Sequence, residues 1–201
     1  MSEQPHAGGS PGLVAQVIRR LPKLERLYVY RAPVSAEGLD AVASRGFELL
    51  PATDASLDLL RGVRQRHQVD PLRALLKRGV PGWFALKDGQ FAGHAFLVAS
   101  RESPERFGGV RLYPGEMAIT SLFVAPAFRG AGLGGALHAQ LVAEAVRAYG
   151  SVANIAWTAD YNVASQRMLA RHGCVRIGTI DRLIVWYRPV ASVYRGAPPR
   201  R

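Results

Sequence analysis

The amino-acid sequence predicts a mixed α/β fold in which helices flank a central, mostly antiparallel sheet. Residues 116–158 comprise an apolar run, a glycine-rich turn, a stretch of helical periodicity and a second apolar run, which is the pattern of a strand–helix–strand crossover. Residues 83–98 form two apolar runs on either side of Asp88-Gly89, a strong signal of a hairpin turn. One parallel crossover and one antiparallel hairpin together predict a sheet of mixed strand direction.

The first quarter of the chain is predicted to contain short elements. Residues 1–24 are expected to be a flexible segment in which 13–24 form a short helix, either docked on the domain or lying on an anionic membrane. Strands are predicted at 27–31 and 47–50, and Pro51 closes the second of them.

Two helices are predicted between these strands and the hairpin. Asp54 is the expected N-cap of the first helix, whose apolar face consists of Leu57, Leu60 and Val63. The second helix covers 72–78 and begins directly after Pro71, because proline is tolerated in the first turn of a helix.

After the hairpin, the sequence predicts a loop, a strand, the crossover helix, a strand, a further helix and two final strands. The loop covers 102–115 and the strand after it 116–124; the crossover helix follows the glycines. The next strand covers 152–158, the further helix 162–172, and the two final strands 176–180 and 183–187. Gly173 is the expected C-terminal cap of the second of these helices. We expect a single domain over 25–190, followed by a mobile basic tail over 191–201.

The composition limits the classes of partner. The formal net charge is +11, nearly all of it from arginines that are spread along the chain. Because no zinc-finger spacing or long basic helix accompanies them, we expect a solvated basic surface and no nucleic-acid partner. No apolar run approaches the ~20 residues that span a bilayer. Cys174 is the only cysteine, which excludes an intramolecular disulfide and suits the cytoplasm, the predicted location.

The glycine-rich turn of the crossover predicts an anion site. Gly130, Gly132, Gly134 and Gly135 fall within six residues, directly before a helix, and Arg129 precedes them. The first N–H groups of a helix have no partner inside it, and glycines allow an anion to approach the main chain. The alternative is a tight strand-to-helix turn that is merely rich in glycine.

Two common phosphate loops fit the glycines less well. The string satisfies G-x-G-x-x-G, but Pro126-Ala-Phe-Arg129 separates it from the strand, and only one crossover surrounds it. A Walker loop ends in Gly-Lys-Ser/Thr, whereas Gly134-Gly135-Ala136 stands here.

A third family fits better. Val124-x-Pro126-x-x-Arg129-Gly-x-Gly132-x-Gly134 resembles the acyl-CoA loop of the GNAT acetyltransferase superfamily, whose core pattern is Arg/Gln-x-x-Gly-x-Gly/Ala. The helix that starts with Asn162-Val-Ala-Ser and ends at Gly173-Cys174 resembles the downstream Asn-x-Ala-Ser helix of that family, which ends in Gly-Phe. The resemblance covers about 116–188, and it implies a sheet splayed in the middle, where the pantetheine arm enters.

The resemblance implies acetyl-CoA as the acyl donor and no metal. Main-chain groups of Leu122, Phe123 and Val124 would bind the pantetheine arm. The pyrophosphate would lie on the loop and the helix start, formed by Arg129, Gly130, Ala131, Gly132, Leu133, Gly134 and Gly135. Asn162 would hydrogen-bond pantetheine, act as a helix N-cap, or do both.

Glu116 is the predicted general base, because it is the only acidic residue on the strand that leads into the loop. In some family members such a carboxylate lies about two residues nearer the loop, where this chain has Ala118. Alternation along a strand would place 116, 118, 120 and 122 on one face. The alternative for Glu116 is a solvated strand-end carboxylate. His94 is the second candidate base, with a packed core side chain as its alternative.

The general acid is where the sequence departs from the family. Leu169 occupies the position, seven residues after the motif asparagine, at which many members have a tyrosine. Tyr161 is adjacent to the motif in sequence, and Cys174, in place of the usual phenylalanine, is expected to pack in the core. Because this tyrosine is absent, a protein that binds acyl-CoA without catalytic turnover stays an alternative interpretation.

The predicted function is direct transfer of an acetyl group from acetyl-CoA to a primary amine of a small molecule or amino sugar. A protein N-acetyltransferase is the alternative among enzymes, and a non-catalytic acyl-CoA-binding regulatory module is the alternative of another class. The acceptor would contact 57–78 and 101–114, and a homodimer is left open.

Overall fold

The computed structural model describes residues 22–100, 105–107, 109–185 and 188–196. An eight-stranded sheet in the order β10-β9-β1-β8-β7-β4-β3-β2 forms its centre. The strands are β1 (Lys23–Pro33), β2 (Glu48–Pro51), β3 (Gly82–Lys87), β4 (Gln90–Ala99), β7 (Glu116–Val124), β8 (Ala153–Ala159), β9 (Val175–Val185) and β10 (Arg188–Gly196). Every neighbouring pair is antiparallel except β7 and β8. The predicted fold class is therefore confirmed.

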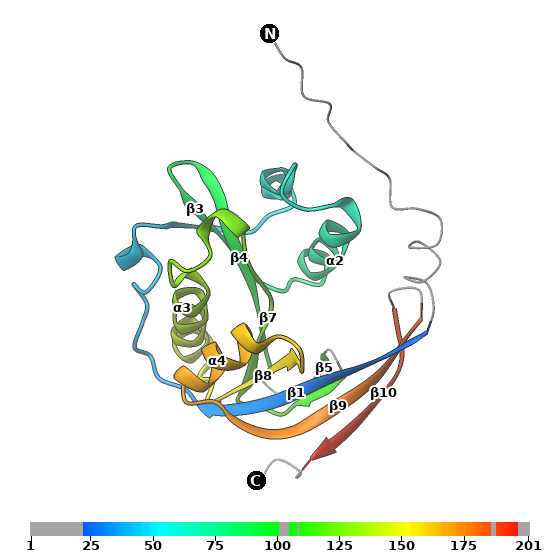
Figure 1. Cartoon of the computed structure of the whole chain (residues 1–201). Helices are drawn as coiled ribbons and strands as arrows, with labels where there is room; N and C mark the ends of the chain where they lie inside the picture. Colours follow the sequence, from blue (N-terminus) through cyan, green and yellow to red (C-terminus); the bar gives the residue numbers. More distant parts are fainter. Residues whose placement is uncertain (1–21, 101–104, 108, 186–187, 197–201) are drawn as a thin grey trace.

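The parallel pair in the middle of the sheet diverges almost at once. β7 and β8 keep register only at Glu116 with Ala153 and at Met117 with Asn154. β7 then continues to Val124 beside β4, and β8 continues to Ala159 beside β1. Figure 1 shows the consequence: β4 and β7 run at a steep angle to β8 and β1. The sheet is thus splayed between these strands, and each has one backbone edge that faces the opening.

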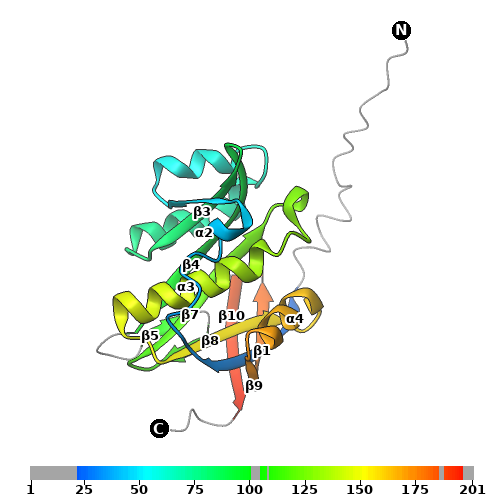
Figure 2. The ribbon, with the colours of Figure 1, turned by 90° about the vertical axis from the view of Figure 1, so that its left-hand side faces the viewer.

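Helices cover both faces of the half-sheet formed by β4 and β7 (Figure 1). α3 (Leu133–Tyr149) buries a row of leucines spaced by four residues, Leu133, Leu137 and Leu141, against one face. The opposite face, with Phe84 and Phe96, packs against the 3-10 helix η2 (Ala55–Leu60) and against α2 (Arg66–Lys77). α4 (Val163–Arg171) lies beside β8 (Figure 2), where Leu169 contacts the core. None of the helices in the described ranges is long and apolar enough to cross a bilayer.

The predicted hairpin is confirmed. β3 and β4 are joined by Asp88 and Gly89, whose φ angles are 51° and 74°. Two successive positive φ values define the type I′ turn, whose twist matches that of the flanking strands. The hairpin places His94 and Gly93 of β4 directly beside β7.

Three helix predictions need correction. Lys23 and Leu24 are the first residues of β1, while 13–21 of the expected helix lie outside the described residues. α2 begins at Arg66 rather than at Leu72, because a capping box between Gln65 and Gln68 starts it, and Pro71 lies within it.

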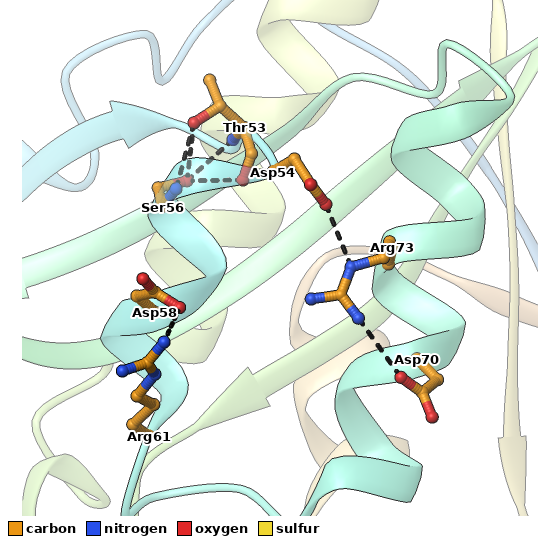
Figure 3. Close-up of polar contacts among 7 residues, drawn as sticks. All are labelled: Thr53, Asp54, Ser56, Asp58, Arg61, Asp70 and Arg73. Carbon is orange, nitrogen blue, oxygen red and sulfur yellow. Dashed lines mark hydrogen bonds and ion pairs between the residues drawn. The ribbon is translucent and has the colours of Figure 1, made fainter.

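Asp54 is the N-cap residue of η2, as predicted, but its side chain makes no capping hydrogen bond. Its carboxylate accepts a hydrogen bond from Arg73 Nε at 3.0 Å, while Thr53 and Ser56 form the local hydrogen bonds (Figure 3). The element is a short 3-10 helix that ends at Leu60, so Val63 falls beyond it and is 40% exposed. Arginine pairing, which links η2 to α2, replaces capping as the role of Asp54.

Three further predictions, for a loop, the final strands and the C-terminal tail, also change. Within the predicted loop 102–115, β5 (Glu105–Phe107) pairs with β6 (Val110–Leu112). The two predicted final strands form one strand, β9, as far as Val185, and residues 186–187 lie outside the described residues. Residues 191–196 of the predicted mobile tail belong to β10, which pairs with β9, while 197–201 are also outside the described residues. The β10 residues from 189 on are exposed, so main-chain hydrogen bonds rather than burial define this strand, and no hydrophobic pattern marks it.

Candidate functional site

The glycine loop leads from the end of β7 into α3 through the turn η3 (Pro126–Phe128). Gly130 and Gly132 have φ angles of 85° and 76°, the left-handed region that glycine adopts without strain. Gly132 is the N-cap of α3 and offers no side chain to its first amides. A 17-residue helix therefore directs its positive end and its unpaired N–H groups at the loop.

Two guanidinium groups flank the loop. Arg129 Nε donates to the Val124 carbonyl oxygen at 3.4 Å, and Arg45 Nη1 donates to the Ala131 carbonyl oxygen at 3.4 Å. Arg45 ends the 3-10 helix η1 (Ala43–Arg45), and sequence reasoning missed it because it lies 86 residues before its contact. Both are exposed, so they add positive charge beside the loop, where binding of an anion stays a prediction.

β7 contains a bulge next to the opening of the sheet. His94 of β4 pairs with Phe123, whereas Phe96 pairs with Thr120, so β7 has one extra residue between these positions. Ser121 lies in the bulge with a φ angle of 52° and an exposed side chain. Such an extra residue reverses the direction of every later side chain.

The bulge corrects the predicted alternation. Before it, Ala118 faces away from α3, but after it Leu122 and Val124 pack against the core cluster of α3, and Phe123 packs against the α2 side. Leu122 therefore does not share a face with Glu116, Ala118 and Thr120, as strict alternation would require. Ser121, an exposed residue, lies on the part of β7 that is no longer paired with β8.

Glu116 lies at the closed end of the opening, where β7 and β8 are still paired. The residue is 4% exposed; Oε2 accepts a hydrogen bond from the Tyr113 N–H at 3.0 Å, and Oε1 lies 3.4 Å from Nη2 of Arg31. Eight residues of strand, roughly 26 Å, separate it from Val124 at the loop. The role of base stays a prediction, and these contacts offer a structural role in its place.

His94 is fully buried among aromatic rings. It stacks on Phe123 with ring centroids 5.6 Å apart and also contacts Phe84, Phe91 and Phe96. Neither ring nitrogen has a hydrogen-bond partner of good geometry in the described part of the chain. Burial, and secondarily the charge of Arg64, lower the pKa of His94 to about 4, although the backbone of Ser121 favours the protonated ring. The ring is neutral and packed at neutral pH.

Asn162 is the N-cap of α4. Its Oδ1 accepts a hydrogen bond from the Ser165 N–H at 3.1 Å, so the N-cap interpretation is confirmed. The side-chain NH₂ group takes no part in this bond and is able to donate to a ligand. Binding of pantetheine by Asn162 stays a prediction.

A polar cluster that sequence reasoning missed lies where β7 and β8 diverge. Asn154 of β8, buried, contacts Nε2 of His138 of α3 at 3.0 Å. His138 lies against His172 at the end of α4, with ring centroids 4.5 Å apart. Burial, and then His172, lower the pKa of His138 to about 4. The cluster joins α3, α4 and β8 behind the opening with neutral side chains.

The predicted acid positions contain no acid directed at the opening. Leu169 and Cys174 are buried together beside Ala156, and burial raises the pKa of the Cys174 thiol to about 11. Tyr161 is 73% exposed and its hydroxyl donates to Glu25 Oε1 at 3.4 Å. Within the described ranges, no group of three or more His, Cys, Asp or Glu side chains is arranged to hold a metal ion.

A protein-family model and several solved structures match this chain over the region that contains the loop and the split sheet. The model of the acetyltransferase (GNAT) family matches residues 51–174, more than half of the chain. A GCN5-related N-acetyltransferase-like protein from Streptococcus suis superposes with a TM-score of 0.55 and 16% identity, covering 83% of this chain and 64% of that one. An acetyltransferase from the GNAT family of Colwellia psychrerythraea gives 0.56 and 14%, covering 82% and 57%.

A third structure with the same fold belongs to a larger enzyme. The GCN5-related glucosamine N-acetyltransferase region of a fungal multi-domain GH3 β-N-acetylglucosaminidase gives a TM-score of 0.58 and 11% identity, covering 83% of this chain and 22% of that one. In all three cases this chain spans less than two thirds of the related protein. No protein with a curated description matches the sequence.

Proposed function

The chain belongs to the acetyltransferase (GNAT) family, and from this premise we propose that it transfers an acetyl group from acetyl-CoA directly to a primary amine of a small molecule. The observation that supports this best is the combination of an uncapped helix start with the opening between β7 and β8. The first can hold a pyrophosphate, and the second exposes strand edges that pair with the amides of a pantetheine arm.

The residues present fit this cofactor. A Cβ added at Gly130 would meet no atom within 4 Å, so the main chain there is open to a phosphate. Arg129 and Arg45 neutralise its charge from two sides. Bound acetyl-CoA would supply the thioester, and the chain would orient it along β7 so that the acceptor amine approaches at Ser121.

The acceptor amine must lose a proton before or during attack. Of the two predicted bases, Glu116 is buried in an ion pair and His94 is buried among rings, where a positive charge would be costly. We propose that the proton passes to water beside the exposed residue Ser121, rather than directly to either side chain.

One observation favours a second function. Leu169 is 2% exposed and packs in the core where the family tyrosine would stand, so no hydroxyl is available there to protonate a departing thiolate. A non-catalytic acyl-CoA-binding module is the corresponding proposal. Within the described residues, no feature specifically favours the alternative function of a protein N-acetyltransferase.

The proposed function is tested by ligand protection together with turnover. Acetyl-CoA at a hundred times its dissociation constant is expected to raise the free energy of unfolding by about 2.7 kcal/mol, measured as a higher melting temperature. NADH and ATP at the same concentration are expected to leave it unchanged. Release of CoA thiol in the presence of a panel of primary amines would then establish transfer. Protection without thiol release from any amine favours the module, and protection by NADH alone contradicts the cofactor.

Glu116→Gln separates the structural from the catalytic role of that residue. If its contacts with Arg31 and Tyr113 are structural, the substitution lowers the free energy of unfolding by about 1.5–3 kcal/mol, the usual worth of a hydrogen bond to a charged group. We expect this, with kcat/KM for one amine changed less than about tenfold, and a matching loss of stability in Arg31→Gln. A fall in kcat/KM of about 10²–10⁴-fold that shrinks at high pH would instead identify Glu116 as the base.

A further inference from the structure

We propose that Arg64 binds a carboxylate of the acceptor, so that the substrates of this protein are amines that also bear a carboxylate, such as amino acids. The inference rests on the proposed function and narrows the class of its acceptor. The evidence lies in the surroundings of Arg64, in the pairing of nearby acidic residues, and in the position of Arg64 relative to β7.

Arg64 is a half-buried cation for which the described part of the chain supplies no counter-ion. It lies in the turn between η2 and α2, and its guanidinium carbon is 4.1 Å from the centroid of the Phe123 ring. Its buried Nε has no hydrogen-bond partner, and no ion pair of Arg64 occurs among the described residues. Burial lowers the pKa of Arg64, and no carboxylate opposes this effect. Burying an unpaired charge is costly, so such a group is expected where a ligand completes it.

The carboxylates of the neighbouring elements are already paired with other arginines (Figure 3). Asp58 of η2 pairs with Arg61 at 2.9 Å. Arg73 of α2 bridges Asp54 at 3.0 Å and Asp70 at 3.3 Å. Among the described residues, the carboxylates at and between η2 and α2 therefore pair with Arg61 or Arg73, and none of them pairs with Arg64.

Phe123 places this guanidinium beside the opening of the sheet. The ring belongs to β7, two residues after the exposed bulge residue Ser121, and faces the α2 side rather than α3. Its partner on β4, His94, packs against it and is neutral, so it does not compete for an anion. A carboxylate bound by Arg64 therefore lies on the face of β7 from which an amine reaches the main chain at Ser121.

This arrangement predicts selection between amines. A planar guanidinium stacked on an aromatic ring is suited to a bidentate interaction with a carboxylate. An acceptor with several amino groups and no acid would be repelled by the same charge. A plain amino sugar would leave Arg64 unpaired and is expected to be a poorer substrate than an amino acid.

The test compares each of the twenty L-amino acids with its own carboxamide, as acceptors of acetyl groups from acetyl-CoA. For at least one pair, kcat/KM for the acid is expected to exceed that for the amide by about 10–100-fold, the usual difference for a charged hydrogen-bond partner. Arg64→Gln is expected to remove this preference. Arg61→Gln, an exposed arginine already paired with Asp58, is the matched control and should keep it. A structural role of Arg64 would appear instead as a lower melting temperature of Arg64→Gln with the preference retained.

A binding measurement distinguishes failure of this inference from failure of the proposed function. The same pairs are titrated by calorimetry into the CoA-saturated protein. Tighter binding of an acid than of its amide, lost in Arg64→Gln, supports the inference even if no acetyl transfer occurs. Equal binding of acids and amides, no binding of either, or a preference that survives in Arg64→Gln overturns it, and acetylation of amides or other amines would then leave the proposed function intact.

Discussion

Replacing Gly134 with valine is expected to lower the affinity for acetyl-CoA by about 10²–10⁴-fold, since it would deny the anion two or more charge-assisted hydrogen bonds of about 1.5–3 kcal/mol each. A Cβ at this position would point at Val124, Leu122 and Met168, at 3.5, 3.7 and 4.0 Å. The added methyl groups would therefore fill the space between the start of α3, the end of β7 and α4, which is where we propose that the cofactor enters.

The fold is expected to tolerate this change. The Cβ itself would make ordinary van der Waals contacts, and Gly134 is not among the glycines with a left-handed backbone. The two further methyl groups of valine meet only side chains, those of Val124, Leu122 and Met168, which can shift more readily than main chain. Gly132→Val should also abolish binding, but its φ of 76° makes the substitution strained, so stability would fall as well. Calorimetric titration of acetyl-CoA, with the melting temperature as the control for folding, measures both. An unchanged dissociation constant in a folded Gly134→Val protein would refute the proposed cradle.

The second large effect is expected at Gly93, where alanine should lower the free energy of unfolding by about 1–3 kcal/mol or more, as overpacking of a core does. Gly93 pairs with Val124 across β4 and β7, and its added Cβ would lie 2.6 Å from the carbonyl oxygen of Phe123. That oxygen belongs to the main chain directly after the bulge, so it cannot turn aside as the end of a flexible side chain could. The strand must shift or the pairing must open.

Urea unfolding measures this loss. Gly134→Ala is the matched control, because the same methyl group there meets atoms no closer than 3.5 Å and should change stability little. Equal stability of the two alanine variants would show that β7 moves away from β4 at little cost. In that case packing against Gly93 of β4 would not fix the position of the bulge at Ser121. Another contact would have to hold Ser121 in the proposed acceptor site.

Local patterns in the sequence were sufficient for the elements of the site. The helix after the glycines follows from leucines spaced by four residues and the hairpin from Asp88-Gly89, while the anion site indicated by the glycines stays a prediction. Each signal involves residues within about one turn of each other, where backbone geometry alone decides the outcome. For the same reason the motif asparagine could be identified as a helix N-cap.

Only the tertiary structure determined the contacts between residues that are far apart in the chain. The bulge at Ser121 depends on the pairing of β7 with β4, and because it reverses side-chain direction, it overturned the alternation assumed for Leu122. Strand β10 depends on hydrogen bonds to β9 and has no hydrophobic pattern of its own. Arg45 at the loop and Arg64 over Phe123 come from segments 86 and 59 positions away from their contacts. A charged side chain interacts with whichever groups the fold brings within a few ångströms of it. Local sequence periodicity does not predict which residues these will be.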